Sequence, residues 1–223
     1  MMESIKINRP LHSEWWKSQK ISAGYDQRRF CSLGGRFYDH REKICINQAL
    51  MLAERQAPVR SVLDFACGTG RISGYLAARG HKVVCCDVSE SMLQEAKNRL
   101  RPTKLAQGFV LSDIYYGSFR DNAFDCVTAI RLFQHLSSDE RANALAELAR
   151  ISRSFVLVNV MFSSPYYDCL RRLRIAVGRY ATRYTASKEE ILRETSLAGL
   201  KIRATILSQP LFNGNMILLL ERS

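Results

Sequence analysis

The sequence lacks the long apolar runs that would place it in a membrane. Its 223 residues contain no stretch of about 18 consecutive apolar residues, the length that a spanning helix needs. The N-terminal segment has no charged stretch followed by an apolar one, as a secretory leader would have, and no repeat or low-complexity tract occurs. We therefore expect no transmembrane span and a cytoplasmic location, with membrane contact of a peripheral kind only.

Cysteine pairs at metal-binding spacing are also missing. The chain has 7 cysteines but no C-x-x-C pair. Cys85 and Cys86 are adjacent, Cys67 lies in a glycine-bearing turn, and the others are scattered. An odd number without a regular framework argues against a disulfide scaffold and suits a reducing compartment. We expect free thiols and no bound metal.

Acidic residues are scarce relative to basic ones. The chain has 21 Asp and Glu against 33 Lys and Arg, for a net charge of +12, and is 47% hydrophobic. This length and apolar content suffice for one substantial core, so we expect a single domain. The basic surface favours anionic ligands such as phosphorylated metabolites, anionic lipid or nucleic acid, and charge alone does not separate these.

Apolar runs alternate with amphipathic segments, which predicts an α/β fold with a doubly wound, mostly parallel sheet of seven strands. The expected strands lie near 60–65, 81–86, 106–111, 124–129, 154–160, 201–208 and 215–221. The expected helices lie near 42–55, 70–79, 90–100, 138–151 and 187–198. Pro210 and Asn213-Gly214 separate the last two strands, and this turn signal predicts an antiparallel pair that closes the sheet.

The most informative segment is residues 61–71, where an apolar strand ends at Asp64 and passes through a turn with Gly68 and Gly70 into a helix. Glycine lets a ligand approach the main chain closely. A carboxylate at the end of a buried strand is costly unless a cation or several donors satisfy it. We therefore expect a ligand ammonium near Asp64, which a dinucleotide pyrophosphate would not supply.

The next strand also ends in an acid, Asp87. The spacing from Gly70 is 87 − 70 = 17 residues, close to the roughly 20 expected for an acid that binds ribose hydroxyls. The dinucleotide fingerprint would need its third glycine at Ser73, and Gly74 comes one residue late. A nicotinamide oxidoreductase is therefore disfavoured.

Together with Ser112-Asp113-Ile114 and the fourth strand at 123–129, these segments resemble, in order, the motifs of class I S-adenosylmethionine-dependent methyltransferases. The resemblance is strong over roughly residues 58–160. It implies S-adenosylmethionine as cofactor and a sheet whose last strand is reversed. One departure is Ala66, which stands where the family has its first glycine. Because alanine adds only a methyl group, we expect cofactor binding to survive.

The resemblance also implies roles for individual residues. Asp64 and the turn would hold the methionine end, Asp87 the ribose, and Asp113 with the Ile114 amide the adenine edge. Tyr25 would lie across the cofactor as part of a lid. The full set assigned to the cofactor is Tyr25, Asp64, Ala66, Cys67, Gly68, Gly70, Asp87, Val88, Met92, Ser112, Asp113, Ile114 and Arg131. Three alternatives stay open: Asp113 as a turn former, Met92 as core, and Tyr25 with Trp15 and Trp16 as a staple for an N-terminal helix.

The variable parts of the chain are expected to recognise the acceptor. We divide the domain into an N-terminal lid or cap (1–57), a cofactor-binding core (58–160), a substrate-side segment (161–186) and a C-terminal helix with a strand pair (187–223). The third part is rich in arginine, which favours an anionic acceptor, although a solvated basic helix face is the alternative. Its arginines are Arg171, Arg172, Arg174, Arg179 and Arg183.

The predicted reaction is direct transfer of a methyl group to an oxygen, nitrogen or carbon nucleophile of a small or medium acceptor. His135 is the candidate general base, and a structural role at a helix start is the alternative. A catalytically silent cofactor-binding protein with a basic partner or membrane surface remains an alternative, as does an RNA or protein methyltransferase. Nucleic acid is secondary because residues 130–135 lack the Asn/Asp-Pro-Pro-Tyr/Phe pattern.

Overall fold

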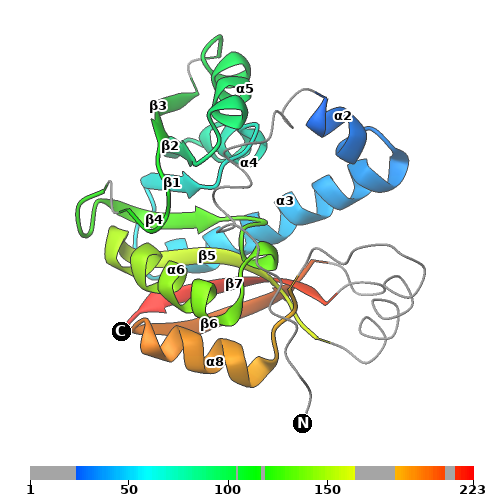
Figure 1. Ribbon diagram of the computed structural model, residues 1–223. Helices are drawn as coiled ribbons and strands as arrows, with labels where there is room; N and C mark the ends of the chain where they lie inside the picture. Colours follow the sequence, from blue (N-terminus) through cyan, green and yellow to red (C-terminus); the bar gives the residue numbers. More distant parts are fainter. Residues whose placement is uncertain (1–23, 104, 117–118, 164–183, 209–213) are drawn as a thin grey trace.

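A seven-stranded sheet in the order β3-β2-β1-β4-β5-β7-β6 forms the centre of the computed structural model (Figure 1). The structure describes residues 24–103, 105–116, 119–163, 184–208 and 214–223. The strands are β1 (Ser61–Phe65), β2 (Lys82–Asp87), β3 (Ala106–Leu111), β4 (Phe124–Ala129), β5 (Ser152–Met161), β6 (Leu200–Leu207) and β7 (Asn215–Arg222). Strand β7 runs antiparallel to both of its neighbours, and the remaining pairs are parallel. The predicted fold class is confirmed.

Helices cover both faces of this sheet. The described helices are α2 (Tyr25–Phe30), α3 (Leu33–Glu54), α4 (Arg71–Ala77), α5 (Glu90–Leu100), the 3-10 turn η1 (Phe133–His135), α6 (Ser138–Ile151) and α8 (Lys188–Leu197). Leu63 on β1 packs in the cluster with α6 and α8, whereas the preceding Val62 packs in the cluster with α3 and α4. Successive side chains of a strand point to opposite faces, which explains why these central strands are apolar throughout.

Helices α5 and α8 are among those that begin at a serine cap. The Ser187 hydroxyl accepts from the Glu190 amide at 3.1 Å, and the Glu190 carboxylate accepts in return from the Ser187 amide at 2.8 Å. Ser89 caps α5 by accepting from the Met92 amide at 3.4 Å. Such caps satisfy amides that have no partner inside the helix. The predicted starts of these helices are therefore close to the observed ones.

The N-terminal helices differ from the prediction. Helix α3 begins at Leu33 instead of near residue 42, and α2 was not predicted. Two consecutive glycines, Gly34 and Gly35, disfavour a helix in this segment. In the fold, however, Gly35 lies against α2, where a Cβ would come within 2.5 Å of the Arg29 carbonyl oxygen. A residue with no side chain thus lets α2 fold back onto α3.

Several predictions fall on residues outside the described ranges. Trp15, Trp16, Cys169, Pro210, Asn213 and the arginines between 171 and 183 belong to this group. Within the part of the chain that the structure describes, no helix is both long enough and apolar enough to cross a bilayer.

Candidate functional site

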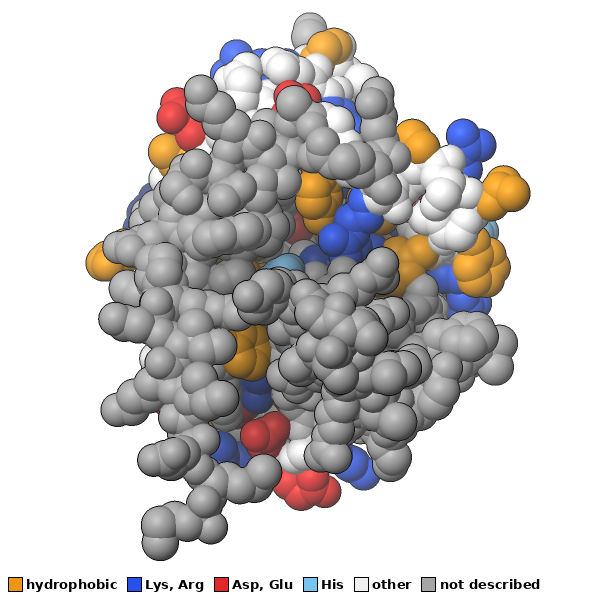
Figure 2. Space-filling model, turned by 45° about the vertical axis from the view of Figure 1, so that its right-hand side comes forward, with side chains coloured by type: hydrophobic (Ala, Val, Ile, Leu, Met, Phe, Trp, Pro, Cys, Tyr) orange, Lys and Arg blue, Asp and Glu red, His pale blue; other side chains and the backbone are white. Residues whose placement is uncertain are grey.

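A pocket of about 820 Å³, partly open to solvent, lies where the carboxyl ends of β1, β2 and β4 meet. Ligands of open α/β sheets bind at this edge. Figure 2 shows basic side chains and a histidine in a hollow on this face. The lining residues are Tyr25, Asp26, Phe30, Asp64, Ala66, Cys67, Gly68, Thr69, Arg71, Ile72, Asp87, Val88, Met92, Ile130, Arg131, Leu132 and His135.

Asp64 lies at the end of β1 with its side chain only 1% exposed. Its carboxylate accepts from the Ser73 hydroxyl at 2.6 Å and from the Thr128 hydroxyl at 2.9 Å. Burial raises the pKa of Asp64 to about 6, although these two hydrogen bonds and the charge of Arg71 favour the ionised form. Ser73, which matters in the sequence only as a missing glycine, therefore orients this acid. The ligand ammonium expected beside Asp64 stays a prediction.

The raised pKa of Asp64 predicts a pH-dependent stability. Below pH 3.8 the group is protonated in both states, and between pH 3.8 and about 6 the folded state binds the extra proton. The protonated Asp64 carboxyl therefore stabilises the folded state at low pH. This contribution, about 2 to 3 kcal/mol, is lost as the pH rises through about 6. Urea unfolding of the wild type and of Asp64→Asn from pH 4 to pH 7.5 measures it. Parallel pH curves for the two proteins would contradict this assignment.

The turn after β1 holds three residues in left-handed backbone conformations. Gly68 has φ +56° and Gly70 φ +74°, and a Cβ on Gly70 would come within 2.9 Å of Leu100 on α5. Gly70 is thus placed for helix packing and is not among the lining residues. Ala66 has φ +59° and does line the pocket. Since this conformation costs an alanine about 1 kcal/mol, the departure from the family glycine is tolerated under strain.

Asp87 ends β2 and is held by backbone amides. Its Oδ2 accepts from the Gly68 amide at 2.7 Å and its Oδ1 from the Ser89 amide at 2.9 Å. Burial raises the pKa of this carboxyl, and hydrogen bonds from the Ser89, Gly68 and Val88 amides oppose that shift by favouring the ionised form. Val88 and Met92 line the pocket beside it. The first two predicted acids therefore reach one cavity from adjacent strands.

The adenine-side residues are adjacent to this cavity without lining it. Ser112, Asp113 and Ile114 are all buried after β3, and the Ser112 amide donates to the Asp87 carbonyl at 3.1 Å. Asp113 Oδ1 accepts from the Tyr115 amide at 3.4 Å, which fits the alternative of a turn former. A role of these residues in binding adenine stays a prediction.

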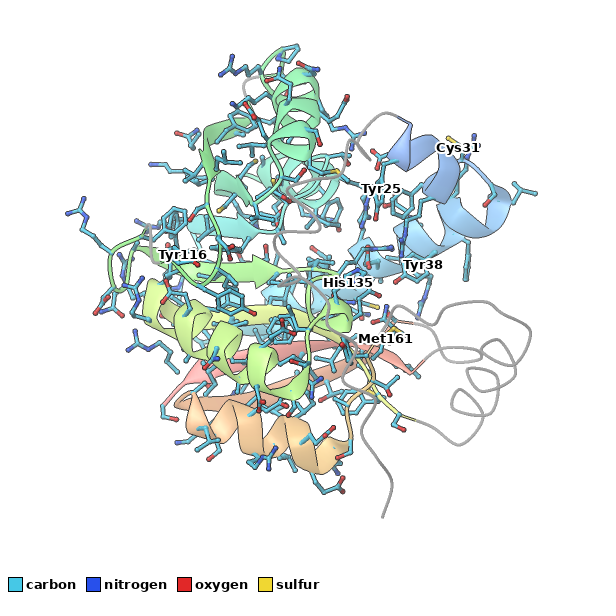
Figure 3. The ribbon with its side chains drawn as sticks, in the orientation of Figure 1. Tyr25, Cys31, Tyr38, Tyr116, His135 and Met161 are labelled. Carbon is cyan, nitrogen blue, oxygen red and sulfur yellow. The ribbon has the colours of Figure 1, made fainter. Side chains whose placement is uncertain are left out.

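Helix α2 covers the turn and contributes Tyr25, Asp26 and Phe30 to the pocket. Asp26 accepts from the Thr69 hydroxyl at 3.0 Å and forms an ion pair with Arg99 of α5. In Figure 3, Tyr25 lies on the side of α2 that faces the sheet, whereas Cys31 lies on the outer side. The fold thus brings the predicted lid residue to the cavity. The contacts of Asp26 with Thr69 and Arg99 could not be predicted, because these partners are far away along the chain.

Arg131 and His135 follow β4 and complete the pocket. His135 belongs to η1, where its Nε2 lies 3.1 Å from the Gln134 amide nitrogen (Figure 3). Arg71, which directly follows the glycine turn, also lines the cavity and forms ion pairs with Asp39 and Glu42 of α3. Among the described residues, no cluster of three or more His, Cys, Asp or Glu side chains could hold a metal ion. The six described cysteines are free.

Known proteins match this chain in sequence over its central part. Residues 62–154 match the family model described as a methyltransferase domain. A demethylmenaquinone methyltransferase of Clavibacter sepedonicus is 37% identical over 157 residues, which are 69% of this chain and 59% of that protein. The chloroplastic magnesium protoporphyrin IX methyltransferase of Arabidopsis thaliana is 29% identical over 163 residues, 70% of this chain and 51% of that protein. The chain spans about half the length of these curated relatives.

Solved structures share the fold over nearly the whole chain. Magnesium protoporphyrin IX methyltransferase from Synechocystis PCC 6803 with bound SAH has a TM-score of 0.76 at 20% identity, covering 96% of this chain and 100% of that one. An S-adenosylmethionine-dependent methyltransferase from Clostridium acetobutylicum ATCC 824 has a TM-score of 0.67 at 16% identity, covering 92% and 98%. The sequence matches and the shared architecture agree: the chain belongs to the class I S-adenosylmethionine-dependent methyltransferase family.

Proposed function

We propose that this protein transfers a methyl group from S-adenosylmethionine to a small or medium organic acceptor. The observation that carries the proposal is the meeting of Asp64, Asp87 and the turn at residues 66–68 in one pocket at the carboxyl edge of the sheet. Each is a position that the family resemblance assigns to the cofactor. Their convergence supports a nucleoside site with room for an amino-acid tail.

The residues present fit this cofactor. The Asp87 carboxylate, held by backbone amides at the end of β2, is the acceptor available to ribose hydroxyls. Val88 and Met92 supply an apolar wall for a base. The Asp64 carboxylate, bound by two hydroxyls at the end of β1, is the acid available to an ammonium group.

The bound cofactor supplies an electrophilic methyl group, so the chain has mainly to position the acceptor in line with it. Asp26, Thr69 and Arg99 hold α2 over the turn, which excludes water from one side of the pocket. His135 also lines the pocket, and we assign to it the removal of a proton from a hydroxyl acceptor.

Replacement of His135 tests this assignment. His135→Gln removes the proton acceptor but keeps a polar side chain, so turnover is expected to fall by about a hundredfold with unchanged affinity for S-adenosylhomocysteine. Steady-state rates as a function of pH and calorimetric titrations provide the two readouts. A variant with the wild-type rate and pH profile would contradict a catalytic role and support a structural role for His135.

The class of acceptor follows from the relatives and from the pocket. The relatives are named for magnesium protoporphyrin IX, demethylmenaquinone and ubiquinone biosynthesis, which supports a small or medium organic acceptor for this chain. Arg71 and Arg131 in the pocket wall favour an acceptor that carries negative charge. The free thiols of the described residues suit the cytoplasm, which we propose as the location.

A labelled-methyl assay tests the function. Purified protein is incubated with S-adenosylmethionine that carries a deuterated methyl group, together with one candidate acceptor at a time. The candidates are demethylmenaquinone, magnesium protoporphyrin IX and a bacterial lipid and metabolite extract. Mass spectrometry is expected to find one acceptor that gains the labelled methyl group together with S-adenosylhomocysteine. Binding of the cofactor without transfer to any acceptor would favour the silent binding protein. Absence of cofactor binding would overturn the proposal itself.

A further inference from the structure

Arg131 has a strained backbone held in place by a chain of buried side chains. Its φ is +71°, in the left-handed region that residues other than glycine rarely adopt. Its amide donates to the Asn159 side chain on β5, whose Nδ2 donates to Asn215 on β7 at 2.9 Å. Asn215 in turn donates to the Tyr38 hydroxyl on α3 at 2.7 Å. Strain of this kind persists where the surroundings enforce it and is common at ligand sites.

The guanidinium of Arg131 is equally fixed. It is 11% exposed, and its Nε donates to the two oxygens of Glu42 at 3.2 and 3.3 Å. It also stacks on the rings of Tyr38 and Phe30, with centroid distances of 4.4 and 4.9 Å. Its Nη2 is buried and, among the described residues, has no hydrogen-bond partner. A rigid arginine in a pocket wall thus keeps one donor group unused.

The charges around this arginine do not balance. Glu42, only 1% exposed, is shared between Arg131 and Arg71, and Arg71 also pairs with Asp39, which pairs with Lys43. These contacts join three cations to two carboxylates. Burial lowers the pKa of Arg131, and Glu42 opposes that shift. A bound anion would supply both the missing charge and the missing acceptor.

We propose that Arg131 binds a carboxylate group of a ligand in this pocket. The inference rests on the proposed function and assigns a residue to ligand recognition within it. Two pocket ligands can provide the group: the amino-acid end of the cofactor, or an acidic acceptor. A planar guanidinium held between two aromatic rings presents its N–H groups in a fixed orientation, which suits a planar carboxylate.

Titration calorimetry with S-adenosylmethionine and its decarboxylated form tests the first source, because the two differ only in the carboxylate. If Arg131 binds the cofactor, Arg131→Gln is expected to lower the affinity for S-adenosylmethionine by about tenfold. The affinity for the decarboxylated form should fall by less than about twofold. A wild type that binds neither form contradicts the proposed function instead, so the two failures are distinct.

The second source is tested with magnesium protoporphyrin IX and its dimethyl ester, each titrated by fluorescence in the presence of S-adenosylhomocysteine. If Arg131 binds the acceptor, Arg131→Gln is expected to lower the affinity for the free acid by about tenfold. The affinity for the dimethyl ester should fall by less than about twofold. The proposal is overturned if, in both ligand pairs, the variant distinguishes the ligand that has a free carboxylate from the one that lacks it as strongly as the wild type does.

Two further variants keep the test independent of folding. Arg131→Lys retains the charge beside Glu42 but lacks the planar fork, so it is expected to fold and to lose part of the discrimination. If Arg131→Gln does not fold, Arg131→Lys carries the comparison, and full wild-type discrimination in it overturns the proposal. Arg203→Gln is the matched control, since Arg203 pairs with Glu221 at 3.5 Å on the outer strands and is 49% exposed. It should bind every ligand as the wild type does.

Discussion

Replacing Asp87 with alanine is expected to lower the affinity for S-adenosylhomocysteine by a hundredfold or more. In the proposed complex the Asp87 carboxylate accepts two ribose hydroxyls, and hydrogen bonds to a charged group contribute about 1.5 to 3 kcal/mol each. Two of them amount to about 3 to 6 kcal/mol, which exceeds a factor of 100. Thermal-shift titration measures the loss: ligand at a hundred times the wild-type Kd stabilises the wild type by about 2.7 kcal/mol, and in the variant this gain should fall to about 0.4 kcal/mol or less.

The same carboxylate also has a structural role, which the controls must separate. Asp87 accepts from the Gly68 and Ser89 amides, so alanine leaves both amides without that acceptor and weakens the turn. Asp87→Asn keeps one acceptor oxygen at this position and is expected to fold while still losing most of the affinity. Asp121→Ala is the matched surface control, because Asp121 is 69% exposed and pairs with Arg150 away from the pocket. If Asp87→Asn binds as tightly as the wild type, the ribose lies elsewhere.

The strands of the core could be predicted because their signals are local. Each central strand is an apolar run that ends in an acid or a turn, and burial on both faces requires such a run. The beginning of α3 could not be predicted in this way. Gly34-Gly35 lowers the helical propensity of the segment, and its helix is supported by ion pairs between Arg71 and α3 that join distant parts of the chain.

The candidate site shows the same difference between residues with a local sequence signal and residues whose contacts join distant parts of the chain. The positions of Asp64 and Asp87 in the motifs predict that both bind one cofactor. The structure places both in the pocket, since acids at the ends of neighbouring parallel strands share one edge of the sheet. Glu42 had no such signal, since it meets Arg131 across 89 residues of sequence. Ser73 was visible only as a departure from a glycine motif, although its hydroxyl binds Asp64. The sequence therefore locates the ends of strands well and the side chains that orient them poorly.

The largest stability effect is expected at a buried ion pair that joins α6 to α8. Arg141 and Glu194 are 3% and 1% exposed, and two guanidinium nitrogens of Arg141 contact the Glu194 carboxylate at 2.7 and 3.0 Å. Among the described residues, Arg141→Met leaves the buried Glu194 carboxylate with the Ser138 hydroxyl as its remaining donor, at 2.7 Å. Removing one partner of such a pair costs about 3 to 5 kcal/mol, so the free energy of urea unfolding should fall by this amount.

The double replacement Arg141→Met and Glu194→Leu distinguishes an unpaired charge from lost packing. It removes both charges, so most of the lost stability should return, and a double variant no more stable than Arg141→Met would contradict the mechanism. The pair also bears on the site, because Arg141 donates to the Leu136 carbonyl at 3.3 Å, one residue after His135. Since methionine cannot make that bond, the double variant should recover its stability while the position of η1, and with it turnover, remains impaired.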